Sequence, residues 1–416
     1  MFSTIFRLFI TSNQLMKYLK TSLIIIFLVL MACEPAPSSE EHGNLKKWYK
    51  GNLHTHSYWS DGDEFPEMIM DWYKQKGYHF LALSDHNILA EGDKWITISE
   101  EDTRRKSFSD YLSDYGADWV QQRTTSGQME VKLKTLAEYR SRFEEEEKFL
   151  IIQSEEITDQ FEDKPVHLNA TNIQSLIEPQ GGNSVADVMQ RNIDAVHEQR
   201  SQTGVPILPH VNHPNFGYAV AIEDMIALDR ERFFEVYNGH PQVHNLGDSL
   251  HMSTEDMWDL INISYLAEGK PIMFGLATDD AHHYHTKGKK WSNAGRGWIM
   301  VQASSLSVEA LIGAMESGAF YASTGVTLQE ILFDGGKLSI EVDPEPNVSY
   351  QIEFIGCKKG SSASELLESH TGKTASYILT DDILFVRGRI TSTKRQDNPI
   401  EDFVYEMAWT QPLVGK

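Results

Sequence analysis

The middle of the chain repeats one pattern, a short apolar run followed at once by histidine or carboxylate residues. Short runs of this kind, bounded by polar residues, glycine or proline, are typical of buried strands. They cover residues 80–83, 149–152, 205–208 and 272–276. A parallel α/β barrel places its active site at the carboxyl ends of its strands, so the pattern predicts such a barrel with a polar site at that edge.

Helical periodicity fills several of the intervals between these runs. It predicts helices over residues 64–76, 183–202 and 308–317, and Gly77 is a typical residue for ending the first of them. Residues 88–148 interrupt this rhythm with charged sequence and scattered aromatic residues, and we expect a helical insertion there. Its aromatic side chains either line the cleft or belong to a solvated pair of surface helices.

The sequence changes near residue 329 to alternating polar and apolar positions, broken by glycine, proline, aspartate and asparagine. Alternation of this kind predicts antiparallel strands with one buried face. We therefore divide the chain into a main α/β domain over residues 48–325 and a small antiparallel β domain over residues 326–416.

The first residues have the pattern of a bacterial export signal, with lysines followed by an apolar run over 23–31 that is too short to span a bilayer. Residues 30–33 resemble a lipobox, which makes 1–32 the signal peptide and Cys33 the acylated first residue of the mature chain. Residues 33–47 then form a flexible tether. The sequence thus predicts an exported protein, lipid-anchored to the bacterial outer membrane and facing the periplasm or the cell surface. An uncleaved anchor helix is the alternative.

Composition limits the partners of the protein. Hydrophobic residues make up 41% of the 416 residues, which is enough for a full core, and the formal net charge is -23. An acidic surface repels nucleic-acid polymers, whereas a small anionic substrate is compatible with it if bound cations make the cleft locally positive. Cys33 and Cys357 are the only cysteines, so acylation of the first leaves no intramolecular disulfide. No feature indicates an oligomeric state.

Histidine and carboxylate residues supply the candidate chemistry. His54 and His56 are two apart, so on an extended strand both imidazoles lie on the same face, and Asp61 follows in a turn. Asp280 and His282 repeat this spacing after the last apolar run. Imidazole and carboxylate without thiolate suit zinc, manganese or iron.

Five of these segments resemble, in order, the motifs of the PHP (polymerase and histidinol phosphatase) superfamily of metal-dependent phosphoesterases. They are His54-Thr55-His56 with Ser60-Asp61-Gly62, Ser84-Asp85-His86-Asn87, Glu156-Ile157-Thr158, His213-Pro214 and Asp280-Ala281-His282. The resemblance covers residues 48–325. It implies a distorted TIM-like (β/α)7 barrel of PHP type, followed by the antiparallel β domain.

The resemblance also implies two or three divalent metal ions, each with its own ligands. The first ion would take His54, His56, Glu156 and Asp280, the second Asp61, His86 and His282, and the third His167, His213 and a shared, bridging Glu156. Asp61 stands where the family often carries a histidine.

Four further residues are candidates for roles beside the metals. Asp85 is placed to orient a ligand or to transfer a proton. Arg296, between two glycines at a strand entrance, would bind a phosphate bidentately or else form a surface ion pair. His240 would reach the substrate from its loop or else be an ordinary loop histidine. His210 would lie behind the ligands or in the core.

The resemblance implies a metal-dependent hydrolase, first of all a phosphoesterase that cleaves a small phosphomonoester or phosphodiester with a metal-bridged hydroxide. The same site would suit hydrolysis of a carbamate, an ester or an amide. A surface binding lipoprotein with structural metals is the alternative from another class. Because adjacent strand residues face opposite ways, we expect Glu156, and not its neighbour Glu155, to face the metals.

Overall fold

The computed structural model describes residues 46–99, 103–400 and 403–415. The predicted signal peptide, Cys33 and nearly all of the tether therefore lie outside the described residues. None of the described helices is both long and apolar enough to cross a membrane. The helices are α2 (Pro66–Gln75), α3 (Thr103–Tyr115), α4 (Leu136–Phe143), α5 (Val185–Thr203), α6 (Ile222–Ile226), α7 (Thr254–Ala267) and α8 (Val308–Glu316).

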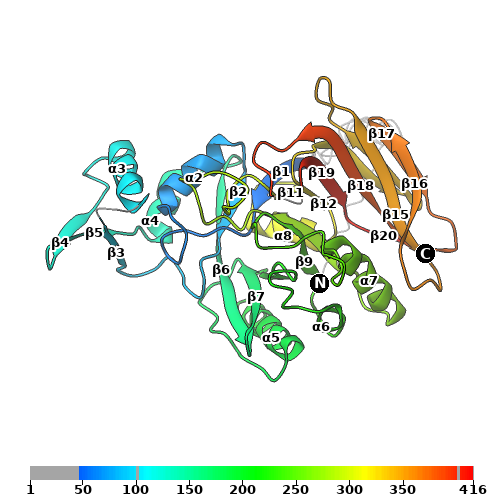
Figure 1. Ribbon diagram of the computed structural model, residues 1–416, viewed down its shortest axis with the longest axis horizontal. Helices are drawn as coiled ribbons and strands as arrows, with labels where there is room; N and C mark the ends of the chain where they lie inside the picture. Colours follow the sequence, from blue (N-terminus) through cyan, green and yellow to red (C-terminus); the bar gives the residue numbers. More distant parts are fainter. Residues whose placement is uncertain (1–45, 100–102, 401–402, 416) are drawn as a thin grey trace, which may run out of the picture. The chain divides into compact units, whose positions relative to one another are not determined.

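The strands fall into one large sheet and two small ones (Figure 1). They are β1 (Lys47–Asn52), β2 (Phe80–Leu83), β3 (Trp95–Ile98), β4 (Gln122–Thr125), β5 (Gln128–Lys132), β6 (Leu150–Phe161), β7 (Lys164–Thr171), β8 (Leu208–Val211), β9 (Phe233–Asn238), β10 (Phe274–Thr278), β11 (Trp298–Ala303), β12 (Phe320–Ser323), β13 (Leu328–Asp334), β14 (Lys337–Val342), β15 (Tyr350–Lys358), β16 (Glu365–Thr371), β17 (Thr374–Ile378), β18 (Ile383–Arg395), β19 (Tyr405–Thr410) and β20 (Leu413–Val414).

One part of the large sheet builds the main α/β domain, with the strand order β10-β9-β8-β7-β6-β2-β1-β11. The strands β1, β2 and β6 are parallel, and so are β8, β9 and β10. In contrast, β7 is antiparallel to both of its neighbours, because a tight turn between Phe161 and Lys164 joins it to β6 without an intervening helix. The predicted parallel barrel is therefore corrected to a mixed sheet.

The two ends of this sheet segment meet just beyond β1 and β10. An isolated parallel bridge joins Thr55 to Ala281. His56 N donates a hydrogen bond to Ala281 O, and Asp280 N donates one to His54 O, each at 2.9 Å. Within the described ranges β1 and β10 form no continuous ladder, so the predicted closure into a (β/α)7 barrel is not observed. The bridge still brings the segments that carry His54 and Asp280 together.

An apolar cluster fills the inside of this curved sheet. Leu53, Phe80, Ile152, Leu208 and Leu276, which come from β2, β6, β8, β10 and the end of β1, are buried against one another. Full burial of such a side chain stabilises the fold by about 1.5–3 kcal/mol. The cluster fixes the strands relative to one another, so the polar residues that follow them meet at one edge.

The insertion over residues 88–148 differs from the helical excursion that we predicted. It contains α3 and α4, but also the antiparallel sheet β3-β5-β4 (Figure 1). These strands have four or five residues each, and β4 and β5 are largely charged or polar, so we did not predict them. Tyr111 and Tyr139 are buried in clusters that include side chains of α2, and Trp119 Nε1 donates to Glu67 Oε1 at 2.6 Å. The aromatic residues therefore pack the insertion onto α2.

Antiparallel strands occupy the C-terminal segment, as its alternation predicts. The sheet β13-β14-β17 packs on β15 and β18 through apolar side chains such as Leu338, Ile340, Ile352, Phe354 and Ile390. The strands β19, β18, β15 and β16 continue the large sheet, since β12 pairs with β19. The predicted boundary near residue 325 therefore does not interrupt the sheet.

Candidate metal centre

Several residues predicted as metal ligands lie just beyond the ends of strands of the large sheet, whereas Glu156 lies within β6 and His167 within β7. β1 ends shortly before His54, β2 shortly before His86, and β10 shortly before Asp280. Each predicted ligand lies within 4 Å of another one of opposite charge type, so the fold brings the whole set together. The set is His54, His56, Asp61, His86, Glu156, His167, His213, Asp280 and His282.

Four side-chain atoms surround a gap in the middle of this cluster: His54 Nε2, His56 Nε2, Glu156 Oε2 and Asp280 Oδ1. Each nitrogen lies 3.3 Å from Glu156 Oε2 and 3.2 Å from Asp280 Oδ1. Ligands about 2.0–2.1 Å from a tetrahedral zinc ion are about 3.3 Å apart, so the gap has the size of a metal site. Both nitrogens and Glu156 Oε2 are buried without a hydrogen-bond partner among the described residues. The donor set therefore fits a divalent ion.

Glu156 directs its two carboxylate oxygens to two different groups of side chains. Oε2 faces the central gap and lies 2.9 Å from His86 Nδ1. Oε1 lies 3.0 Å from His167 Nδ1 and 3.4 Å from His213 Nε2. The carboxylate is thus oriented to touch two neighbouring cations, which is the bridging position that the family resemblance implies.

The register of β6 separates Glu156 from Glu155. Glu155 Oε1 accepts a hydrogen bond from Ile177 N at 2.7 Å, on the side of the strand away from the histidines. Burial raises the pKa of Glu155 to about 8, so this carboxyl group is mostly protonated at neutral pH. The structure has the register that the sequence predicts.

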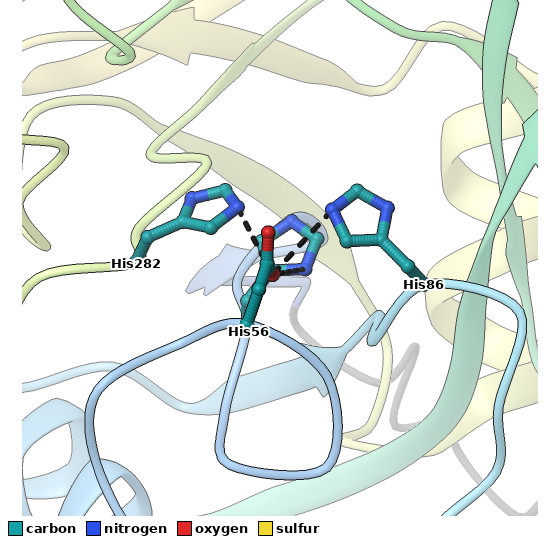
Figure 2. A group of neighbouring side chains, drawn as sticks. His56, His86 and His282 are labelled. Carbon is teal, nitrogen blue, oxygen red and sulfur yellow. Dashed lines mark ion pairs between the residues drawn. The ribbon is translucent and has the colours of Figure 1, made fainter.

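Asp61 forms a second group with three histidines. Its Oδ1 lies 3.4 Å from His282 Nε2, 3.5 Å from His86 Nε2 and 3.9 Å from His56 Nδ1. Figure 2 shows the rings of His56, His86 and His282 gathered around one point. His56 therefore faces the central gap with Nε2 and this group with Nδ1, a sharing between two positions that the sequence analysis did not include. The Asp61 side chain is 58% exposed, which leaves this group open to solvent.

The charges of the cluster determine its protonation states. Burial opposes ionisation of Glu156 and Asp280, but the neighbouring histidines hold the pKa of both carboxyl groups well below the usual range. Burial, together with His282 and His86, lowers the pKa of His56 to about 3. Ionised carboxylates and neutral imidazoles are the forms that bind metal, so His54, whose pKa the facing carboxylates raise well above its usual value, would release a proton on binding an ion.

Glu235, on β9, orients His54, and the sequence analysis assigned it no such role. Its Oε1 lies 2.7 Å from His54 Nδ1 and accepts a hydrogen bond from Thr278 Oγ1, also at 2.7 Å. With the proton on Nδ1, His54 directs the lone pair of Nε2 into the central gap. A glutamate in the middle of the apolar strand Phe233–Asn238 is the signal that identifies such a residue, because a buried charge needs a partner.

His210 and His240 lie near the ligands without belonging to the central gap. His210 is fully buried, with Nε2 3.6 Å from Glu235 Oε1, so it lies behind His54, as one of our alternatives has it. The His240 ring lies 5.7 Å from the His282 ring, beside the group around Asp61. His240 therefore remains a candidate for contact with a substrate.

Arg296 is not available for substrate, which corrects the prediction made for it. Its side chain is buried, and its guanidinium donates to the carbonyl oxygens of Gly239, Gly288, Trp291 and Asn398 and weakly to Asn398 Oδ1. These contacts use all five donors of the guanidinium. The glycines on either side of Arg296 in the sequence led us to expect an accessible side chain. In the structure this side chain instead connects the surrounding loops.

Asp85 forms no hydrogen bond with a ligand side chain in the described part of the chain, which supports an orienting role for it and not the alternative of proton transfer. Its Oδ1 accepts from Ser57 N at 2.8 Å, Ser60 N at 3.1 Å and Ser60 Oγ at 2.6 Å, and its Oδ2 accepts from Ser57 Oγ at 2.8 Å. Both oxygens are therefore occupied. Asp85 acts indirectly, by fixing the turn that carries Asp61.

No family model matches the chain, and no curated protein matches it either. Among solved structures, the chain is similar to a two-domain protein from Bacteroides vulgatus containing a predicted PHP-like metal-dependent phosphoesterase, with 14% identity over 88% of this chain and 96% of that one and a TM-score of 0.38. It is also similar to an amidohydrolase from Chromobacterium violaceum with bound sulfate and no metal, with 12% identity over 56% and 88% of the two chains and a TM-score of 0.27. Because the identities and TM-scores are this low, the similarities carry no argument about the function of this chain. The function has to be argued from the chain's own residues.

Proposed function

We propose that the protein is a metal-dependent hydrolase of PHP type whose substrate is a small phosphomonoester or phosphodiester. The supporting observation is the central gap between His54, His56, Glu156 and Asp280, which has the spacing of a metal site and a carboxylate directed to two positions. Two or three divalent ions held there would polarise the substrate and lower the pKa of a coordinated water.

The protein's own residues prepare this site for an anion. The Glu235 carboxylate fixes the tautomer of His54, and Asp85 fixes the turn before Asp61. His240 Nδ1 accepts a hydrogen bond from Gln242 N at 3.2 Å, and burial lowers the pKa of His240 to about 4. A neutral His240 with an occupied Nδ1 carries its proton on Nε2, so it is placed to donate to a substrate oxygen.

Hydrolysis of a carbamate, ester or amide is a second candidate, and the position of Arg296 favours it. Arg296 is the arginine that the sequence analysis placed at the substrate. In the structure its guanidinium donates only to backbone carbonyl groups and one amide oxygen. A neutral carbonyl substrate needs less positive charge at the site than a phosphate does.

A panel of substrates with a common leaving group distinguishes these reactions. Metal-loaded protein would be assayed with p-nitrophenyl phosphate, bis-p-nitrophenyl phosphate, p-nitrophenyl acetate and a p-nitrophenyl carbamate, beside the His54→Ala variant. We expect the phosphate esters to be cleaved fastest and all turnover to be lost in His54→Ala. Faster cleavage of the acetate or carbamate would instead support the second candidate. Tight metal binding without turnover of any substrate would support a binding lipoprotein.

We also propose that the protein is exported and anchored to the bacterial cell envelope through lipid on Cys33. The support is the lipobox-like sequence that ends at this cysteine, and the acidic surface is compatible with small anionic substrates in that location. Mass spectrometry of the membrane fraction would find a diacylglyceryl-modified Cys33 at the N-terminus. A Cys33→Ser protein that stays in the membrane would contradict the anchor.

A further inference from the structure

A second cavity, of about 260 Å³, lies beside the segment that follows His282. Lys50 of β1, Trp72 of α2, Tyr78 and Trp298 of β11 are among the residues that line it. None of the predicted metal ligands lines this cavity. It is therefore a site separate from the metal centre, with aromatic walls and positive charge.

Three lysines line this cavity in a strongly acidic protein. They are Lys50, Lys76 and Lys287, and none of them has an ion pair with a carboxylate among the described residues. The Lys50 ammonium lies between two aromatic rings, 4.0 Å from the Tyr78 centroid and 3.8 Å from the Trp298 centroid. Cation–π contacts stabilise an ammonium group but leave its hydrogen-bond donors unused. Three lysine ammonium groups around one cavity favour the binding of an anion there.

The acidic residues of the cavity do not neutralise these lysines. Glu406 lies 3.1 Å from Lys394, which is outside the cavity lining, and Asp397 is the other carboxylate. Burial lowers the pKa of Lys50 to about 8, which shows that nearby carboxylates compensate its charge only in part. An anion bound beside Lys50 would supply the missing compensation.

We propose that this cavity binds a small organic anion that carries a flat ring, with its charge at Lys50 and Lys76 and its ring against Trp72 and Trp298. The size of the cavity, the unpaired lysines and the aromatic walls each support this class of ligand. The proposal is independent of the hydrolase, because it uses no metal ligand.

The cavity also has a physical connection to the metal centre. Tyr284 lines it, and the Tyr284 hydroxyl donates to His56 O at 3.0 Å and lies 2.6 Å from Thr55 Oγ1. A ligand that contacts Tyr284 thus contacts the residue that supports His56. Binding in the cavity is the quantity to test first, because it does not depend on any turnover.

Calorimetric titration of the whole protein with benzoate tests the proposal directly. Benzamide serves as the uncharged probe of the same shape, and acetate as the anion without a ring. We expect benzoate to bind at one site per chain and at least about tenfold more tightly than either control, since benzamide lacks the charge that the lysines would bind and acetate lacks the ring that would pack against the tryptophans. Equal binding of benzamide would overturn the anion assignment, and equal binding of acetate would overturn the ring.

Variants then locate the bound benzoate. We expect Lys50→Met to weaken its binding at least about tenfold, while the exposed Lys373→Met has no effect. His54→Ala, which disrupts the metal centre, should also leave it unchanged. If circular dichroism shows that Lys50→Met is unfolded, the exposed Lys76→Met takes its place. Binding that is lost in His54→Ala and retained in the lysine variants would assign benzoate to the metals and overturn the proposal, as would the absence of saturable binding.

Discussion

Two buried clusters of charged residues within the described ranges are built differently. In the first, Arg387 of β18 donates from Nε and Nη2 to the two oxygens of Asp259, at 2.7 and 3.0 Å, and its Nη1 lies 3.0 Å from Glu255 Oε2. Ser364 Oγ completes the group by donating to Asp259 Oδ2 at 2.7 Å. Each charge in this cluster faces an opposite charge.

The metal centre holds more buried atoms without a hydrogen-bond partner than this cluster, in which Arg387 Nη1 is the one such atom among those just named. His54 Nε2, both ring nitrogens of His56 and Glu156 Oε2 are buried without a hydrogen-bond partner among the residues described. Several nitrogen and oxygen atoms instead face the same gap. A buried ionic cluster that satisfies itself stabilises a fold, whereas one whose unsatisfied atoms converge on one point is organised around something that it binds.

The largest expected effect comes from removing the carboxylate that faces both positions. We predict that Glu156→Gln lowers bound metal by at least one ion per chain and abolishes hydrolysis, because one amide cannot replace the two anionic oxygens beside two cations. Elemental analysis and the substrate panel measure both effects. Glu155→Gln is the matched control, since Glu155 faces the other side of β6 and its carboxyl group is mostly protonated at neutral pH. If Glu155→Gln proved equally damaging, the gap would not be the metal site.

The pattern of apolar runs placed several of the ligands because that signal is local, and the family resemblance supplied the rest of the set. A histidine or carboxylate that follows an apolar run is at a strand end whatever the neighbouring strands do, and the ends meet at one edge of a sheet. For this reason His54, His86 and Asp280 are found together even though the predicted barrel is not closed.

The sequence could not predict features that depend on partners far along the chain. Glu235 orients His54 across 181 positions, and the acceptors of Arg296 include Asn398, 102 positions away. The antiparallel course of β7 follows from the short turn after Phe161, which an expectation of alternating strands and helices overlooks. In each case the decisive contact is tertiary, so periodicity and local motifs carry no trace of it.

Breaking the first cluster should affect stability and leave the metals in place. Arg387→Met leaves the carboxylate of Asp259 buried without its cation and leaves Glu255 with Arg389 alone, and we predict a loss of about 3–5 kcal/mol in the free energy of unfolding. Urea denaturation measures this, and elemental analysis should find unchanged metal in the folded variant. Arg389→Met is the control, because the Arg389 side chain is 31% exposed and its ion pairs contribute at most about 1 kcal/mol. Metal loss in folded Arg387→Met would mean that the two clusters are coupled.

A smaller effect is expected from Glu235, which supports a ligand without facing the gap. We predict that Glu235→Gln weakens the affinity for the first metal ion about 10- to 100-fold, because the amide no longer stabilises the Nδ1 proton of His54 as a carboxylate does. Competition with a chromophoric chelator measures the affinity. Glu231→Gln, which changes a buried glutamate just before the same strand, should leave it unchanged. Equal effects of the two substitutions would assign Glu235 to general packing and not to His54.

Glu231 shows what happens to a buried carboxyl group that belongs to neither cluster. Its Oε1 accepts hydrogen bonds from Arg232 N and Phe233 N, each at 2.8 Å, while its Oε2 has no hydrogen-bond partner in the described ranges. Burial raises the pKa of Glu231 from 4.5 to about 8, against the smaller opposing effect of these hydrogen bonds. Between these two pH values the folded protein keeps a proton that the unfolded chain has released. Its stability therefore falls as the pH rises through this interval and is level above it.

Glu231→Gln should remove the part of the pH dependence that Glu231 contributes, while Glu155, whose pKa burial also raises to about 8, contributes equally in both proteins. The free energy of unfolding of the natural protein should decrease between pH 5.5 and pH 8.5 by up to about 3 kcal/mol more than that of the variant. Urea denaturation at both pH values measures the difference, with the exposed Glu330→Gln as a control that should follow the natural protein. Parallel curves for the natural protein and Glu231→Gln would mean that Glu231 is ionised in the fold. This protein would then tolerate a buried carboxylate that faces no cation. The comparison of the Arg387 cluster with the metal centre would need revision, because buried atoms without partners would no longer indicate a binding site.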